Sequence, residues 1–167
     1  MLIEKPDKYI HSDEFHRQIK RVYNKKLDWA VNKKSENMAH VLYEPTHFNN
    51  NYEDSRRGKG KNFAKWIFSE QIGTEENLFH SGMELVIDSY LEPFAAIGLH
   101  YHHNDEEIYY ILEGSISMTT VNSDNQESTQ DLFPGDAHAV KQNQGHYGTS
   151  GENGARFLAI AFKMSKE

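Results

Sequence analysis

The chain has 167 residues, of which 26% are charged and 37% hydrophobic, and it contains no cysteine. This composition is typical of one globular domain, and it excludes disulfides and cysteine-based zinc sites. The net charge of −7 argues against general affinity for nucleic acids, and the N-terminus resembles neither a secretory signal nor a membrane span, so we expect a cytoplasmic protein.

The first segment with a clear pattern has apolar residues at helical spacing. Ser12 can act as the N-cap, and Asp13 and Glu14 fall in the first turn, where the helix dipole favours acidic side chains. We expect one amphipathic helix over about residues 13–31, with its apolar stripe packed on the main domain or on a second subunit. The stripe consists of Phe15, Ile19, Val22, Tyr23, Leu27, Ala30 and Val31.

Charge is unevenly distributed along the chain. Residues 17–34 carry seven Lys or Arg and one acid, whereas residues 101–131 carry seven acids and no Lys or Arg. Two solvated faces of opposite sign explain this better than a surface for DNA or an anionic membrane. We therefore expect neither nucleic acid nor membrane as a partner.

The rest of the chain changes from a polar segment to short strands. Residues 44–62 are rich in turn formers and predict a loop or linker. Residues 1–55 are thus expected to form a helical extension and linker, and residues 56–167 a barrel, within one structural domain overall. Apolar segments bounded by turns, without helices between them, are typical of an antiparallel sandwich or barrel. The expected strands are 64–71, 83–91, 96–102, 107–114, 115–121, 137–140 and 155–162.

Three residues around the turn after residue 102 have the chemistry of metal ligands. Side chains two apart in a strand share a face, so His100 and His102 point the same way. A short polar turn follows, and Glu107 opens the next strand, where a hairpin brings its carboxylate near the two imidazoles. Two imidazoles and a carboxylate suit zinc, iron, manganese or nickel.

These residues belong to a longer pattern. His100, His102 and Glu107, followed after six residues by Gly114, resemble the first conserved motif of the cupin superfamily. A second cupin motif is similar to the Pro-Gly-Asp turn at 134–136 and the run that ends at His146. In that run Lys141 stands where proline is usual and Asn143 where glycine is usual, and asparagine tolerates a positive φ.

The resemblance implies a fold and a cofactor. The fold is all-β, a cupin-type double-stranded β-helix (jelly-roll) barrel with an N-terminal amphipathic helix. His146 joins His100, His102 and Glu107 as the ligand set of one divalent transition metal ion per chain (Fe, Mn, Ni or Zn). Glu106 is the alternative carboxylate, because a shorter spacing also occurs in the superfamily.

The roles of several neighbouring residues stay open. Tyr109 shares the face of Glu107 and is either a packing residue or a catalytic hydrogen-bond donor or general base. His138 is a candidate catalytic acid or base if it points inward. Asp105 reads as a solvated turn residue. The aromatic residues of the middle of the chain form core or cap the open end of the barrel; they are Tyr43, Phe48, Tyr52, Phe63 and Trp66.

The resemblance further implies a metal-dependent enzyme acting on a small, oxygen-rich metabolite that chelates the ion, as an isomerase, lyase, cyclase or dioxygenase. The alternatives are a non-catalytic barrel that binds or senses a small ligand, and a barrel whose metal only stabilises the fold. We expect a homodimer, with the N-terminal segment available for pairing.

Overall fold

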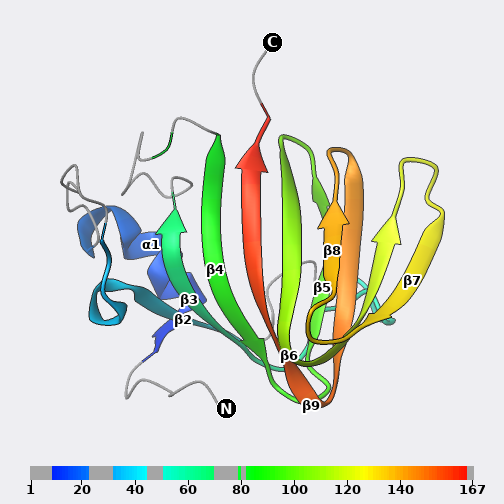
Figure 1. Ribbon diagram of the computed structural model, residues 1–167, viewed down its shortest axis with the longest axis horizontal. Helices are drawn as coiled ribbons and strands as arrows, with labels where there is room; N and C mark the ends of the chain where they lie inside the picture. The colour runs from blue at the N-terminus through cyan, green and yellow to red at the C-terminus, as the bar shows by residue number, and fades with distance from the viewer. Residues whose placement is uncertain (1–8, 23–31, 45–50, 70–78, 80–81, 165–167) are drawn as a thin grey trace.

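The computed structural model describes residues 9–22, 32–44, 51–69, 79 and 82–164 (Figure 1). The chain forms, in order, β1 (Ile10–His11), α1 (Ser12–Val22), a short 3-10 helix (Ser35–Asn37), β2 (Ala39–Tyr43), β3 (Asn62–Ser69), β4 (Met83–Leu91), β5 (Ala96–His102), β6 (Asp105–Val121), β7 (Glu127–Leu132), β8 (Ala137–Val140) and β9 (Gln144–Lys163). Within these residues, no helix is long and apolar enough to cross a membrane.

Two long strands organise the sheet. β6 and β9 pair antiparallel along nearly their whole length, and their register shifts twice, between Ile111 and Glu113 and between Gly114 and Ile116. The first half of β6 also pairs with β8 and its second half with β7. The first half of β9 pairs with β5 and its second half with β4.

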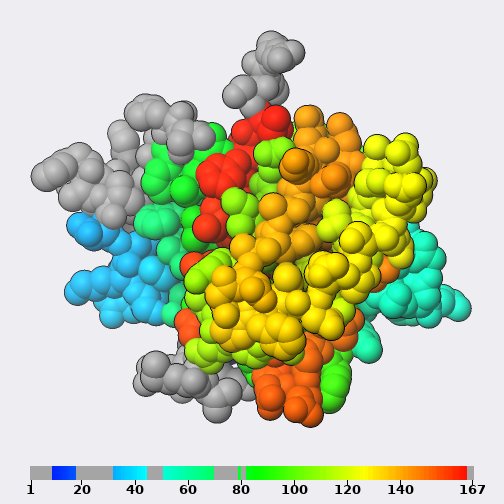
Figure 2. Space-filling model, turned by 45° about the vertical axis from the view of Figure 1, so that its right-hand side comes forward, coloured from blue at the N-terminus to red at the C-terminus, as the bar shows by residue number. Residues whose placement is uncertain are grey.

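The sheet therefore curls over on itself. The order β1-β2-β3-β4-β9-β6-β7, with β5 on β9 and β8 on β6, gives the rolled sheet of Figure 1. In the space-filling view, β7, β8 and the turns around them cover one face of the molecule (Figure 2). The predicted all-β jelly-roll barrel with an N-terminal helix is confirmed.

A glycine explains why the two strands predicted at 107–114 and 115–121 form one continuous strand, β6, in the structure. Gly114 lies inside β6, although the sequence pattern places it at a strand end, and it has a φ of +73°. A Cβ at this position would overlap the carbonyl oxygen of Gly154 on β9. Because glycine permits both this backbone conformation and this close approach, β6 bends here without breaking.

Other boundaries differ because their signals are weak. β7 is polar and largely exposed, and the first half of β9 is rich in Gly, Ser and Thr, so both segments resemble turns in the sequence. β1 and β2 add two strands to the sheet from within the segment expected as the N-terminal extension. The helix is confirmed over Ser12–Val22, whereas its predicted continuation to residue 31 lies outside the described residues.

Three buried clusters lie among the described residues, and the two larger ones hold the barrel and the helix in place. One lies inside the barrel and includes Ile111, Met118 and Phe157. The other joins α1 to the sheet, where Phe15 is 1% exposed and its ring centroid lies 5.1 Å from that of Trp66. Phe15, the residue of the apolar stripe whose side chain the structure describes, thus packs on the protein's own sheet. Full burial of one such aromatic side chain contributes about 2–3 kcal/mol.

Candidate metal centre

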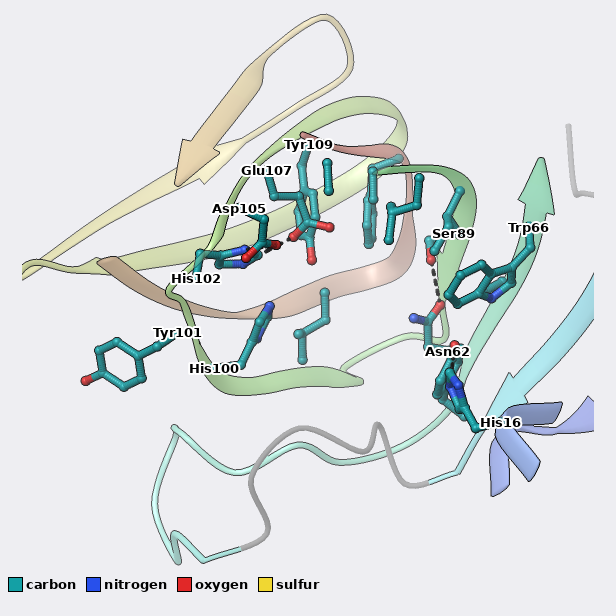
Figure 3. Close-up of a pocket in the computed structure, with 18 residues that line it drawn as sticks. His16, Asn62, Trp66, Ser89, His100, Tyr101, His102, Asp105, Glu107 and Tyr109 are labelled. Carbon is teal, nitrogen blue, oxygen red and sulfur yellow. Dashed lines mark hydrogen bonds and ion pairs between the residues drawn. The ribbon is translucent and has the colours of Figure 1, made fainter. Parts of the chain in front are cut away.

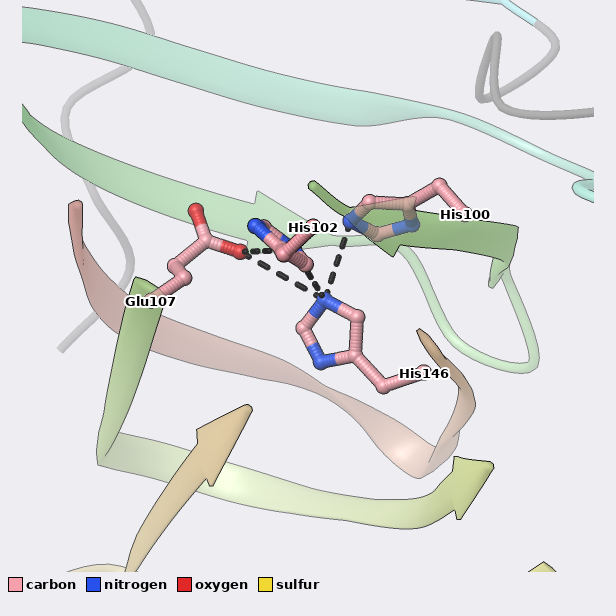
Figure 4. A group of neighbouring side chains, drawn as sticks. All are labelled: His100, His102, Glu107 and His146. Carbon is pink, nitrogen blue, oxygen red and sulfur yellow. Dashed lines mark hydrogen bonds and ion pairs between the residues drawn. The ribbon is translucent and has the colours of Figure 1, made fainter. Parts of the chain in front are cut away.

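Three strands bring four metal-binding side chains together inside the barrel. β5 supplies His100 and His102, β6 supplies Glu107, and β9 supplies His146 (Figure 4). The register places His146 directly opposite His100, and the alternation of β5 puts His102 on the same face. One ligand atom from each of the four residues lies within 4.8 Å of all the others.

The donor atoms point at one another. Nε2 of His146 lies 2.9 Å from Nε2 of His100 and 3.2 Å from Nε2 of His102. Oε2 of Glu107 lies 3.4 Å from the same nitrogen of His146 and 3.6 Å from Nε2 of His102. Three imidazole nitrogens and one carboxylate oxygen therefore surround a common point.

The outer nitrogens fix the rings and their tautomers. Nδ1 of His100 donates to the carbonyl oxygen of Gly98 at 3.0 Å, and Nδ1 of His102 donates to Oδ2 of Asp105 at 2.9 Å. A carbonyl and a carboxylate can only accept, so in the neutral rings the lone pairs sit on the inward Nε2 atoms. Partners of this kind orient the histidine ligands of metal sites.

Burial keeps two of these imidazoles neutral, whereas acidic neighbours make the third more basic. Desolvation lowers the pKa of His100 to about 3 and that of His146 well below its ordinary value. At His102 desolvation also lowers the pKa, but the hydrogen bond that Nδ1 donates to Asp105 and the charge of Glu107 outweigh it, and the net shift is upward. Neutral imidazoles are the protonation state that a metal requires.

Glu107 supplies the clearest sign that a cation fits here. Its side chain is buried, and burial raises the pKa of its carboxyl group. Oε2 makes no hydrogen bond to any described residue. A buried acceptor without a donor, facing three imidazole nitrogens of which at least two present lone pairs, is costly unless a cation or proton satisfies it. The donor set, three His and one Glu, suits a divalent transition metal.

Two further residues touch this group from different sides. The hydroxyl of Tyr109 hydrogen-bonds to the carboxylate of Glu107, and burial, followed by the charge of Glu107, raises the Tyr109 pKa well above its ordinary value. The ring of Tyr109 stacks on Phe157 with centroids 4.5 Å apart. Nε2 of His138 lies 3.0 Å from Nδ1 of His146, and the two rings stack at 15°.

A cavity of about 630 Å³ opens from the metal ligands into the barrel (Figure 3). Tyr109 lines it, whereas His138 lies behind His146 and does not. At the other end its walls come from α1, β2, β3 and β4. That end includes His16, Tyr43, Asn62, Trp66 and Ser89. Buried Tyr43 and Trp66 are therefore both core residues and cavity walls, so each of the two sequence interpretations describes them in part.

The structure also distinguishes Glu106 from Glu107 as the candidate carboxylate ligand. Glu107 is in the metal-binding group, whereas the side chain of Glu106 accepts a hydrogen bond from the backbone of Gln142. Asp105, expected as a solvated turn residue, instead orients His102. The spacing of three residues across a tight turn is the signal that could have revealed this contact. Asn143 has a φ of 62°, as its place in the second motif predicts.

The residues at the far end of the cavity had no comparable sequence signal. Asn62, Ser89 and His16 come from three separate elements, and each looks like an ordinary surface or strand residue in the sequence. Only the packing of α1 and β3 beside β4 brings them to one cavity. His103, by contrast, is exposed and stacks on Tyr101, as the strand alternation predicts.

Known proteins share this fold. Residues 58–167 match the family model described as Cupin. A predicted oxalate decarboxylase from Thermotoga maritima superposes with a TM-score of 0.60 at 21% identity, over 80% of this chain and 100% of the other. Bacillus subtilis oxalate decarboxylase, whose Mn(II) centres have been studied, superposes with a TM-score of 0.57 at 19% identity, over 85% of this chain and 32% of that one.

At these identities the structural likeness shows the fold alone, and this chain spans about a third of the Bacillus enzyme. No curated protein sequence gives a significant match. The family model covers well over half of the chain, including both histidine motifs. The protein therefore belongs to the cupin family.

Proposed function

We propose that this cupin is a metal-dependent enzyme acting on a small, oxygen-rich metabolite that chelates the ion, as an isomerase, lyase, cyclase or dioxygenase. The observation that carries the proposal is the convergence of three imidazole nitrogens and Oε2 of Glu107, which makes no hydrogen bond to any described residue, at one end of a cavity of about 630 Å³. A metal that only stabilised the fold would not need such a cavity beside it.

The four converging side chains would hold the ion, which when bound there supplies Lewis acidity and coordination positions for an oxygen-rich ligand. Iron, manganese, nickel and zinc all suit three imidazoles and one carboxylate. The oxalate decarboxylase neighbours bring small carboxylates into the range of candidate substrates, as a class only. The ligands are His100, His102, Glu107 and His146.

Tyr109 is the proposed catalytic hydrogen-bond donor. It lines the cavity, and its hydroxyl meets a carboxylate that can only accept, so the proton lies on the phenol oxygen. It can present this proton to a substrate oxygen placed above Glu107. The stacking on Phe157 holds the ring in position.

His138 is proposed as a positioning residue. It touches His146 from the side away from the cavity, so it acts on the ring orientation of that ligand and not on the substrate. A His138→Gln variant keeps a side chain that can hydrogen-bond to Nδ1 of His146, whereas His138→Ala does not. We expect the alanine variant to bind metal more weakly and the glutamine variant to recover part of the loss.

Elemental analysis of the untagged protein, purified without chelators, tests the proposal. About one equivalent of a transition metal per chain is expected, lost together with turnover in His100→Ala and His146→Ala. Tyr109→Phe should keep the metal and lose about 100-fold or more in turnover, which is the usual contribution of a positioned acid or base. Protein that takes up no Fe, Mn, Ni or Zn would contradict the proposal.

Turnover is screened with small carboxylic, hydroxy and oxo acids. Metal-loaded protein that binds such acids but converts none of them would favour the non-catalytic, ligand-binding barrel. The homodimer also remains a prediction, and light scattering of the purified chain tests it.

A further inference from the structure

The cavity extends well beyond the metal centre. Its volume of about 630 Å³ equals roughly 20 water molecules at about 30 Å³ each. It lies within the range of about 300–1,000 Å³ that is typical of pockets for drug-sized ligands. A two-carbon diacid on the metal would leave most of this space empty. The shape of the cavity thus favours a longer substrate.

Asn62 provides a polar group on the far wall. The hydroxyl of Ser89, which is 4% exposed, donates to Oδ1 of Asn62 at 3.1 Å. This bond fixes the amide, and its nitrogen makes no hydrogen bond to any described residue. Figure 3 shows Asn62 with this nitrogen turned toward the side of the cavity where His100 lies. Two amide hydrogens are therefore available to a ligand that occupies the cavity.

The wall between the two polar ends is apolar. Ile87 of β4, Ile97 of β5 and Phe157 of β9 line it. The acidic side chains among the lining residues, Asp105 and Glu107, both lie at the metal end. A donor without a neighbouring acid favours an oxygen acceptor and disfavours a cation.

We propose that Asn62, held by Ser89, is a second recognition point that binds a carboxylate at the far end of an elongated substrate. The near end of that substrate carries the oxygens that chelate the metal, and its middle is apolar. This inference rests on the proposed function, because the metal is the other anchor. It narrows the substrate class to acids with oxygen groups at both ends.

Isothermal titration calorimetry of the manganese-loaded protein with matched acids tests this. The probes are 2-oxoglutarate, 2-oxoadipate and 2-oxopimelate, each paired with the 2-oxo monoacid of equal chain length, and oxalate as a ligand too short to reach Asn62. The best diacid should bind about tenfold or more tighter than its monoacid, as one charge-assisted hydrogen bond provides.

Asn62→Leu, which keeps the branched shape but removes the amide, should abolish that preference and leave the affinity for oxalate unchanged. Ser89→Ala frees the amide and should reduce the preference in part, which keeps the test decisive if Asn62→Leu folds poorly. Lys65→Ala on the same strand, outside the cavity lining, is the control and should behave as wild type.

The failures are distinguishable. The second recognition point is overturned if wild type binds diacids and monoacids equally, or if both variants keep the full preference for diacids. In either case, binding of oxalate would still support the metal centre. A wild-type protein that takes up none of Fe, Mn, Ni and Zn overturns the proposed function, and the recognition point with it.

Discussion

The two ends of the cavity are built in different ways. At the metal end, four ligands come from residues 100–107 and 146, and each histidine ring is held by a partner behind it. At the far end, His16, Asn62 and Ser89 come from three separate elements, and their described contacts include the 3.1 Å hydrogen bond from Ser89 to Asn62 and the 3.4 Å contact between the Tyr43 hydroxyl and Nε2 of His16. The first end is suited to holding an ion and the second to shaping a substrate cavity.

This difference separates two tasks. A ligand set for a metal must be held to within a fraction of an ångström, so its orientation is fixed by a second layer of hydrogen bonds. A wall that selects among substrates needs shape and a few donors, and it can change in sequence without disturbing the metal. Variants at one end should therefore leave the other intact.

The largest effect is expected from Glu107→Gln compared with Asn62→Ala. Loss of the carboxylate charge should remove nearly all bound metal, whereas Asn62→Ala should keep one equivalent per chain. Elemental analysis measures both. Metal added at 100 times its dissociation constant should stabilise wild type by about 2.7 kcal/mol, seen as a rise in melting temperature that Glu107→Gln lacks. Loss of metal from Asn62→Ala would show that the two ends are not independent.

The next effect concerns the bend in β6, which the whole barrel requires. Gly114→Ala introduces a Cβ against the carbonyl oxygen of Gly154 at a φ of +73°, so we expect a loss of more than about 3 kcal/mol in the free energy of unfolding. Gly135→Ala is the matched control: its φ is +96°, and no atom lies within 4 Å of the new Cβ. That change should cost only about 1–2 kcal/mol. Urea denaturation of the metal-free proteins compares them, and equal losses would contradict the steric explanation.

The same two ends differ in how far the sequence predicts them. The four metal ligands lie in short motifs with fixed spacing, and strand alternation alone puts His100 and His102 on one face. Strands separated by turns predict an antiparallel sandwich or barrel, and the resemblance to the cupin motifs narrows this to a jelly roll. Both predictions depend on local order in the sequence.

The far wall could not be predicted, because it depends on long-range pairing. Asn62 reaches the cavity since β3 pairs with β4, and His16 since Phe15 anchors α1 on Trp66. Nothing near Asn62 in the sequence distinguishes it from a surface residue. β7 was missed for a related reason, because a largely exposed polar strand lacks the apolar alternation that identifies strands.

Asp105→Asn tests the layer behind the ligands. The carboxylate accepts from Nδ1 of His102, and this bond lowers the pKa of Asp105 and keeps it charged. An amide can present its oxygen to the ring but without the charge, so we expect metal affinity to fall about 10- to 100-fold. Glu106→Gln, next to it and outside the ligand group, should leave affinity unchanged. Competition with a coloured chelator measures the metal dissociation constants of both variants. An equal loss of affinity in the two would mean that the negative charge near the site matters, and not the hydrogen bond to His102.

The smallest effect is expected at the far end, from Tyr43→Phe. The hydroxyl of Tyr43 lies 3.4 Å from Nε2 of His16 and also interacts with the side chain of Trp66, and neither partner is charged by necessity, so its removal should cost about 1 kcal/mol in the free energy of unfolding. Metal stoichiometry and oxalate affinity should stay at wild-type values, because Tyr43 lies at the end of the cavity away from the proposed metal ligands. Tyr109→Phe is the partner experiment, since the same atom is removed from a buried tyrosine at the metal end, where it meets Glu107. If the far wall serves selection and not chemistry, turnover should fall in Tyr109→Phe and stay near the wild-type value in Tyr43→Phe. A loss of turnover in Tyr43→Phe as large as that in Tyr109→Phe would mean that the far wall takes part in the chemistry as well as in selection.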